Sequence, residues 1–84
     1  MTVTFSRETI QQWLTEQMSE LLDKQPSEID PDRALEEMEA LSLDVVHVVA
    51  GAMKEFSIKV PRSEFAGHNT INKLSDLLVS HQAG

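Results

Sequence analysis

Residues 35–46 read Leu35-Glu36-Glu37-Met38-Glu39-Ala40-Leu41-Ser42-Leu43-Asp44-Val45-Val46, and within them an acidic loop gives way to an apolar helix at Ser42. A hydroxyl at a helix start can accept hydrogen bonds from backbone N–H groups that have no partner inside the helix. A phosphate ester at the same position would lie in the positive end of the helix dipole. Ser42 is therefore both a candidate N-cap and the residue on which any chemistry would depend.

Apolar residues on both sides of this stretch follow the spacing of amphipathic helices. Upstream, the pattern over residues 6–22 predicts a helix with Ser6 as its N-cap. Downstream, it predicts a central helix over Ser42–Phe56, and Thr70 begins a last helix. Gly51 lies inside the central helix, where its missing side chain would permit close approach of a neighbouring helix.

The segments between these helices carry the signals of loops and turns. Residues 23–33 contain two prolines and many short polar side chains, which predicts a structured loop with Ile29 as its apolar anchor. Pro61 ends regular structure after the central helix, and residues 62–66 are expected to make one short helical turn. The predicted fold class is all-α: an irregular four-helix bundle with a long first loop and a short third helix, in a single domain over residues 1–84.

Several apolar residues have alternative interpretations. Trp13 and Met18 are expected to pack in the core rather than to contact a ligand. If Leu43 belongs to the core, Leu43→Asp would bury a charge and cost several kcal/mol. Val45 and Val48 either belong to an apolar docking face or pack beneath the long loop, and the sequence leaves both interpretations open.

The composition argues against several classes of partner and site. The 84-residue chain carries 14 acidic and 7 basic side chains, for a formal net charge of −7. This charge disfavours nucleic acid and anionic lipid and favours a basic docking patch on another protein. The chain contains no cysteine, so disulfides and thiolate metal sites cannot form. Neither a secretion signal nor an apolar run of about 20 residues is present, so a cytoplasmic location is expected.

The candidate catalytic residues do not assemble into a catalytic or metal site. On a helix, Asp44 and His47 point roughly 140–200° away from Ser42, so the three side chains cannot converge as a triad. His68 and His81 lack the spacing of a metal pair with His47, and all three histidines are interpreted as solvated. We therefore expect neither catalytic residues nor metal ligands.

Five features together resemble the acyl carrier protein family. They are the first amphipathic helix, the loop 26–32, the sequence Ser42-Leu43-Asp44, the helix end at 56–61, and Thr70-Ile71. The resemblance implies a covalent 4′-phosphopantetheine arm on Ser42, added by a phosphopantetheinyl transferase, whose thiol holds acyl groups as thioesters. It also implies a non-catalytic, monomeric carrier that shuttles acyl intermediates between enzymes of polyketide or fatty-acid-like biosynthesis.

Two departures from the family pattern leave an alternative open. Leu41 stands where the family usually has Asp, and Glu39-Ala40 stands where it usually has Gly, which puts modification by an ordinary transferase in doubt. The alternative is a carrier-like protein-interaction module that is not phosphopantetheinylated. Residues 59–67, however, resemble free-standing carrier proteins of polyketide β-branching cassettes, in which the residue before the serine need not be Asp.

The resemblance also indicates which partners the chain has and where they dock. The implied partners are an acyltransferase, a ketosynthase or a hydroxymethylglutaryl synthase-like enzyme, besides the transferase. We expect the docking surface at the start of the helix that follows Ser42. The residues predicted to bind partners are Leu41, Leu43, Asp44, Val45, His47 and Val48.

Overall fold

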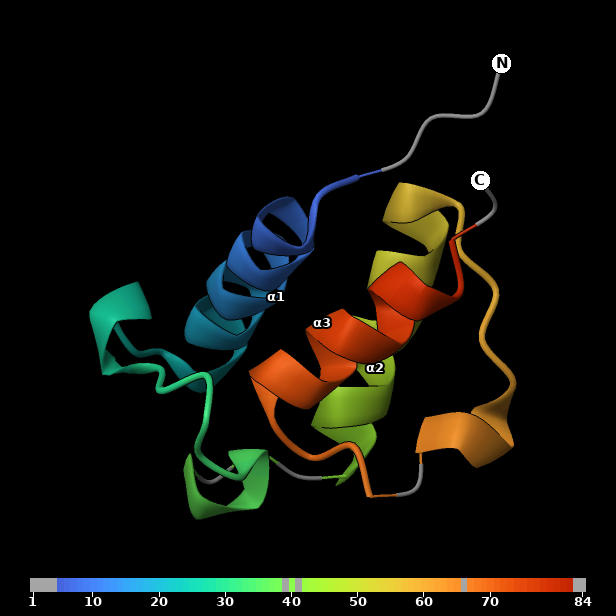
Figure 1. Ribbon diagram of the computed structural model, residues 1–84. Coiled ribbons are helices and arrows are strands. Elements are labelled where there is room, and N and C mark those ends of the chain that lie inside the picture. Colours follow the sequence, from blue (N-terminus) through green and yellow to red (C-terminus); the bar gives the residue numbers. More distant parts are fainter. Residues whose placement is uncertain (1–4, 39, 41, 66, 83–84) are drawn as a thin grey trace.

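The computed structural model describes residues 5–38, 40, 42–65 and 67–82, apart from the side chains of Ser42 and Arg62. Within these residues all regular structure is helical, which confirms the predicted all-α class. The helices are α1 (Arg7–Leu22), η1 (Pro26–Glu28), η2 (Leu35–Met38), α2 (Ser42–Phe56), η3 (Arg62–Phe65) and α3 (Ile71–Ser80), where η denotes a 3-10 helix. α1 packs against both α2 and α3, as Figure 1 shows.

The expected four-helix bundle is not confirmed, because the described residues form three α-helices. The short third helix of the expectation is present as η3, a 3-10 helix of four residues. In this segment the Glu64 N–H donates to the Pro61 carbonyl over 3.0 Å, which is the three-residue spacing of a 3-10 helix. A segment this short cannot complete the hydrogen-bonded turns that stabilise an α-helix.

Side-chain caps set the starts of α1 and α3, as the sequence predicts. The Ser6 hydroxyl accepts from the Thr9 N–H over 3.2 Å, and the Thr70 hydroxyl accepts from the Lys73 N–H over 3.1 Å. Each bond satisfies a backbone donor that has no partner within the helix. Both N-cap predictions are confirmed.

Close approach of α1 explains the glycine inside α2. A Cβ added at Gly51 would lie 3.3 Å from Cη2 of Trp13, so the indole ring packs directly over the glycine. The same ring makes an edge contact with Phe56, with ring centroids 5.7 Å apart. The contact with Trp13 therefore offsets the helix propensity that glycine lacks, and the predicted close approach is confirmed.

The core is one cluster of apolar side chains to which all three α-helices contribute. Met18 is buried and Trp13 packs at the edge of the cluster, in agreement with their predicted core roles. Ile29 is also buried and anchors the long loop as expected. The buried apolar residues are Ile10, Leu14, Met18, Ile29, Leu35, Met38, Ala40, Val48, Val49, Ala52, Phe56, Ile58, Val60, Ile71, Leu74, Leu77 and Leu78.

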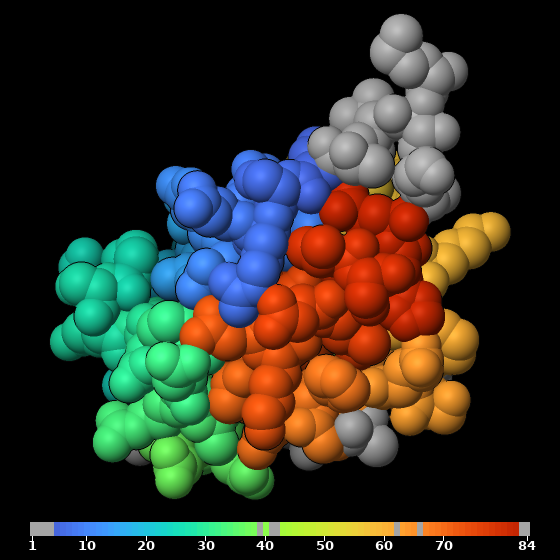
Figure 2. Space-filling view, in the orientation of Figure 1, coloured from blue at the N-terminus to red at the C-terminus, as the bar shows by residue number. Residues whose placement is uncertain are grey.

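Figure 2 shows one face of the molecule. On this face the side chains of α1, of the loop that follows it and of α3 lie against one another. None of the helices formed by the described residues is both long enough and apolar enough to cross a membrane. The three α-helices are 16, 15 and 10 residues long.

Two exposed positions with left-handed backbone should respond oppositely to substitution. Ser57 has φ 55° at the end of α2, and Gly67 has φ 81° with nothing within 4 Å of an added Cβ. A left-handed backbone costs a non-glycine residue about 1–2 kcal/mol. We therefore expect Ser57→Gly to raise the free energy of unfolding by about 0.5–1 kcal/mol, after the entropy that glycine gains in the unfolded chain. Gly67→Ala should lower it by about 1–2 kcal/mol.

Urea unfolding of both variants beside the unmodified protein checks this pair. The opposite signs provide the control, because any general effect of a substitution at an exposed turn would move both variants in the same direction. Equal signs would contradict the backbone explanation.

Candidate functional site

Ser42 is the first residue of α2, and the bounds of this helix are those that the sequence predicts. Ser42 therefore lies within the helix, and its interpretation as the N-cap, the residue before the helix, is not confirmed. The N–H groups of the first helical turn have no acceptor within the helix and make its N-terminal end partly positive. Leu41, which was predicted to bind partners, lies outside the described residues, as does the side chain of Ser42. Asp44 lies in the first turn of α2, where a negative charge is favourable.

The predicted docking residues divide into an exposed group and a buried one. Leu43 is 79% exposed and His47 is also exposed. Asp44 and Val45 are half-buried. Val48 is only 5% exposed and belongs to the core, so the prediction that it contacts partners is wrong. The core interpretation of Leu43 is wrong as well, because nearly all of its side chain faces solvent.

Helix phase explains both corrections. α2 is apolar around much of its circumference, so periodicity in the sequence does not identify the face that packs against the rest of the molecule. The bundle buries Val48 and Val49, whereas Val46 remains 48% exposed. Leu43 and Val46 are three residues apart and therefore lie on one side of the helix, at its Ser42 end.

An apolar groove of about 600 Å³ begins at this exposed surface. Leu43, Val46, Ala50 and Met53 recur along one side of α2 and line it over about three turns of the helix. The opposite walls come from η2 and the segment after it, and from the segment between Val60 and α3. The complete lining is Leu35, Glu36, Ala40, Leu43, Val45, Val46, Val49, Ala50, Met53, Val60, Phe65, His68 and Asn69.

The sequence indicated an apolar face on α2 but not this groove. The missing information was that Leu35, Phe65 and Asn69, up to 34 positions apart in the sequence, line the same groove as α2. The available signal was the apolar residues at 58–65. They lie between the predicted helices, so they must pack against a helix elsewhere in the chain. A periodicity within one helix cannot say which distant segment faces it.

The histidines do not come together, and two of them are less exposed than expected. His47 is exposed on α2, as predicted. His68 is half-buried at the groove wall, and His81 makes an ion pair with Glu64 when its imidazole is protonated. The prediction that all three are simply solvated is wrong for these two. Among the described residues no group of three or more His, Asp or Glu side chains is placed to hold a metal ion.

Acidic side chains lie on η2 and in the first turn of α2, the two elements that flank the chain around Ser42. Glu36 is exposed and lines the groove, Asp44 lies in the first turn of α2, and Glu37 beside Glu36 forms an ion pair with Arg33. Lys54, the basic residue in the last turn of α2, lies at the opposite end of that helix. The groove mouth therefore combines exposed apolar residues with negative charge, which suits a partner surface with basic and apolar groups.

Comparison with known proteins gives two matches. The family model described as the phosphopantetheine attachment site matches residues 12–78. An acyl carrier protein of Rubrobacter xylanophilus is 31% identical over 77 residues, which cover 90% of this chain and 95% of that protein. The first match spans all of α2 and most of α1 and α3.

Proposed function

We propose that this chain, which belongs to the acyl carrier proteins with a phosphopantetheine attachment site, carries its prosthetic arm on Ser42. Family membership implies a covalently attached 4′-phosphopantetheine. It also implies interaction with a phosphopantetheinyl transferase and with biosynthetic enzymes. When attached, the arm supplies a thiol that holds an acyl group as a thioester.

The position of Ser42 is the observation that carries this proposal. Ser42 begins α2, where the positive end of the helix dipole favours a phosphodiester. The next residue, Leu43, is 79% exposed, so this part of the chain is accessible to a modifying enzyme. The residues present at this helix end therefore fit the prosthetic group.

The groove supports an apolar acyl chain as cargo. It begins beside Leu43 and continues along α2 to Met53 and Val60, and its lining is largely apolar. An acyl chain that lies there removes its own surface and that of the groove from water, which stabilises the loaded protein. In this role the protein binds the acyl intermediate, shelters it from water and performs no catalysis itself.

We assign the carrier to polyketide or fatty-acid-like biosynthesis, as a monomer. The assignment to polyketide β-branching draws its support from the sequence resemblance of residues 59–67. A cytoplasmic location and a single domain over residues 1–84 stay predictions from the sequence.

Loading by a transferase tests the proposed function directly. The unmodified protein is incubated with coenzyme A and a broad-specificity phosphopantetheinyl transferase, and its intact mass is measured before and after. We expect one phosphopantetheine increment, and peptide mapping should place it on the peptide that contains Ser42. An unchanged mass would favour the alternative, a carrier-like interaction module without an arm, for which Leu41 in place of Asp is the motivating feature.

A charge at Leu43 should reduce docking without reducing stability. Leu43 is 79% exposed, so Leu43→Asp should change the free energy of unfolding by no more than about 0.5 kcal/mol. In the proposed docking role Leu43 is an anchor residue of the interface, and such hot-spot residues contribute about 2 kcal/mol or more to binding, so kcat/KM for loading should fall at least about tenfold. Loading kinetics and urea unfolding measure the two effects.

Leu21→Asp is the matched control for that variant. Leu21 is a second exposed leucine, 42% exposed near the end of α1, and its substitution adds the same charge. Loading of this variant should remain within about twofold of the unmodified protein. Equal losses of kcat/KM in both variants would contradict a docking role specific to Leu43. A large loss of unfolding free energy in Leu43→Asp would indicate that Leu43 packs in the core.

A further inference from the structure

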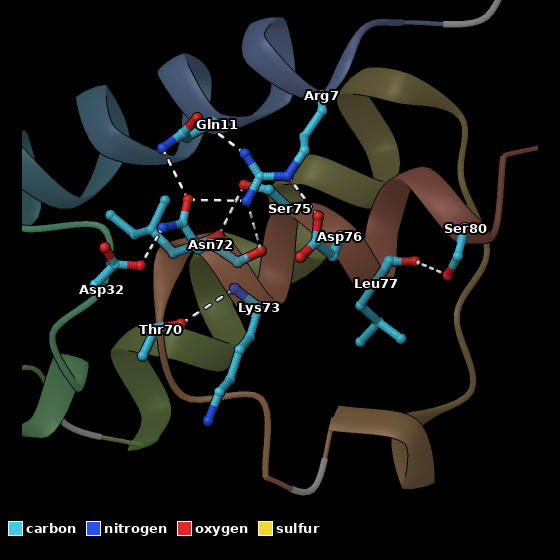
Figure 3. Close-up of polar contacts among 11 residues, drawn as sticks. Arg7, Gln11, Asp32, Thr70, Asn72, Lys73, Ser75, Asp76, Leu77 and Ser80 are labelled. Carbon is cyan, nitrogen blue, oxygen red and sulfur yellow. Dashed lines mark hydrogen bonds and ion pairs between the residues drawn. The ribbon is translucent and has the colours of Figure 1, made fainter.

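Asn72, the second residue of α3, bonds at both ends of its side chain. Its Oδ1 accepts from Gln11 Nε2 and from Arg7 Nη2, each over 2.9 Å, and its Nδ2 donates to Asp32 Oδ1 (Figure 3). Two donors at one end and a carboxylate at the other fix the orientation of the amide. One side chain thus joins α3 to α1 and to the loop before α2.

The backbone joins the same segments. The Asn72 N–H donates to the Pro31 carbonyl over 3.0 Å, and the Leu35 N–H donates to the Asn69 carbonyl over 2.8 Å. The other described backbone bonds donated by the amides of residues 25–40 stay within those residues, such as that from Glu37 to the Ala34 carbonyl. Figure 2 shows the loop lying against the start of α3. Residues 69–72 are therefore the polar attachment point of the loop.

The attached loop forms part of the candidate site. Its residues Leu35, Glu36 and Ala40 line the groove, and the chain continues from Ala40 to Ser42, the first residue of α2. Apolar burial of Leu35 also holds the loop, but such burial is not directional. A hydrogen bond to a charged group is directional, and we expect its loss, together with the like charge of the test variant below, to speed loop opening about tenfold.

We propose that Asn72 is a positioning residue, which ties residues 31–38 to α1 and α3 and so fixes the loop wall of the groove. Its effect on groove and loading rests on the proposed function, whereas its effect on the loop does not. The residues that Asn72 joins are 65, 61 and 40 positions away from it in the chain.

Asn72→Asp separates the two ends of the tie. The new carboxylate can still accept from Arg7 and Gln11, but it has no donor for Asp32 and places a like charge beside it. We expect the loop amides of Leu35, Glu37 and Ala40 to exchange with solvent deuterium at least about tenfold faster, measured residue by residue by NMR. The kcat/KM of transferase loading should fall by a similar factor, mainly through KM.

The reversed pair provides the rescue. In Asn72→Asp combined with Asp32→Asn, the amide at position 32 donates to the carboxylate at position 72, which restores a bond of opposite polarity. Asp32→Asn alone keeps an acceptor for Asn72. We therefore expect exchange and loading within about threefold of the unmodified protein in both variants. Lys73→Gln is the charge control. Lys73 is exposed and adjacent in sequence, and its substitution makes the net charge one unit more negative, as Asn72→Asp does.

The outcomes separate the proposal from the proposed function. Unchanged exchange of the loop amides in Asn72→Asp, or faster exchange that Asp32→Asn does not reverse, would overturn the positioning role. Should Asn72→Asp fail to fold, Asp32→Ala removes the carboxylate that accepts from Asn72 without altering α1 or α3. Loop amides that exchange as slowly in Asp32→Ala as in the unmodified protein would overturn the proposal as well. Failure of every variant to be loaded, with the exchange pattern as expected, would overturn the proposed function alone.

Discussion

Ser42→Ala is expected to abolish phosphopantetheine loading, so that the intact mass stays that of the unmodified chain after any incubation time. The reason is chemical, because the phosphodiester forms on the serine oxygen and alanine has no nucleophilic atom to replace it. The substitution leaves Leu43, Asp44 and the groove unchanged, so docking of the transferase should persist. The variant should therefore inhibit loading of the unmodified protein by competition.

Ser63→Ala is the matched control for the loading experiment. Ser63 is an exposed serine on η3 that is not among the residues lining the groove, and its substitution should leave loading unchanged. Circular dichroism of both variants should report the helix content of the unmodified protein. A mass increment that persists in Ser42→Ala would contradict the assignment of the arm to this residue. Biosynthetic output that persists in the producing host with Ser42→Ala would favour the interaction module without an arm.

Leu78→Ala is expected to lower the free energy of unfolding by about 2–5 kcal/mol. Leu78 is 0% exposed in α3 and belongs to the core cluster, so truncation leaves a cavity that rigid helix packing fills only partly. At about 0.05–0.15 kcal/mol per residue, a chain of 84 residues has a total stability of about 4–13 kcal/mol. The expected loss is therefore a large share of the stability, and urea unfolding at 25 °C measures it.

Leu21→Ala controls for the chemistry of the Leu78 substitution. The same atoms are removed from a side chain that is 42% exposed, where the expected change is within about 0.5 kcal/mol. Near-equal losses in the two variants would contradict the placement of Leu78 in the core. Loading of Leu78→Ala by the transferase should follow its folded fraction, because the residue is not among those that line the groove.

Local interactions explain the parts of the fold that could be predicted from the sequence. The N-caps at Ser6 and Thr70 are each completed by an N–H three residues away, so a short window of sequence contains both partners. The bounds of α2 likewise follow from helix periodicity. Burial of Met18 and Ile29 could be predicted because each is an apolar residue in a polar context.

Predictions failed where the answer depended on what faces a helix. Leu43 and Val48 are both apolar and both on α2, yet one is 79% exposed and the other 5%. No property of either residue decides this, because the rotation of α2 is set by its packing against α1 and the core. The 3-10 geometry of η3 was missed for a related reason, since a segment of four residues takes its shape largely from its surroundings.

The sequence by itself determined the all-α class, the starts of the three α-helices, the ends of α1 and α2, and the candidate role of Ser42, because these depend on residues a few positions apart. Only the tertiary structure decided which side of α2 is exposed, that a groove begins beside Leu43, and that Asn72 joins α1, α3 and the loop. The Asn72 contacts join residues 40 and more positions apart, and the groove brings together residues as far apart in the sequence as Leu35 and Asn69. Such contacts exist only after the helices have packed, since hydrophobic burial selects the arrangement as a whole.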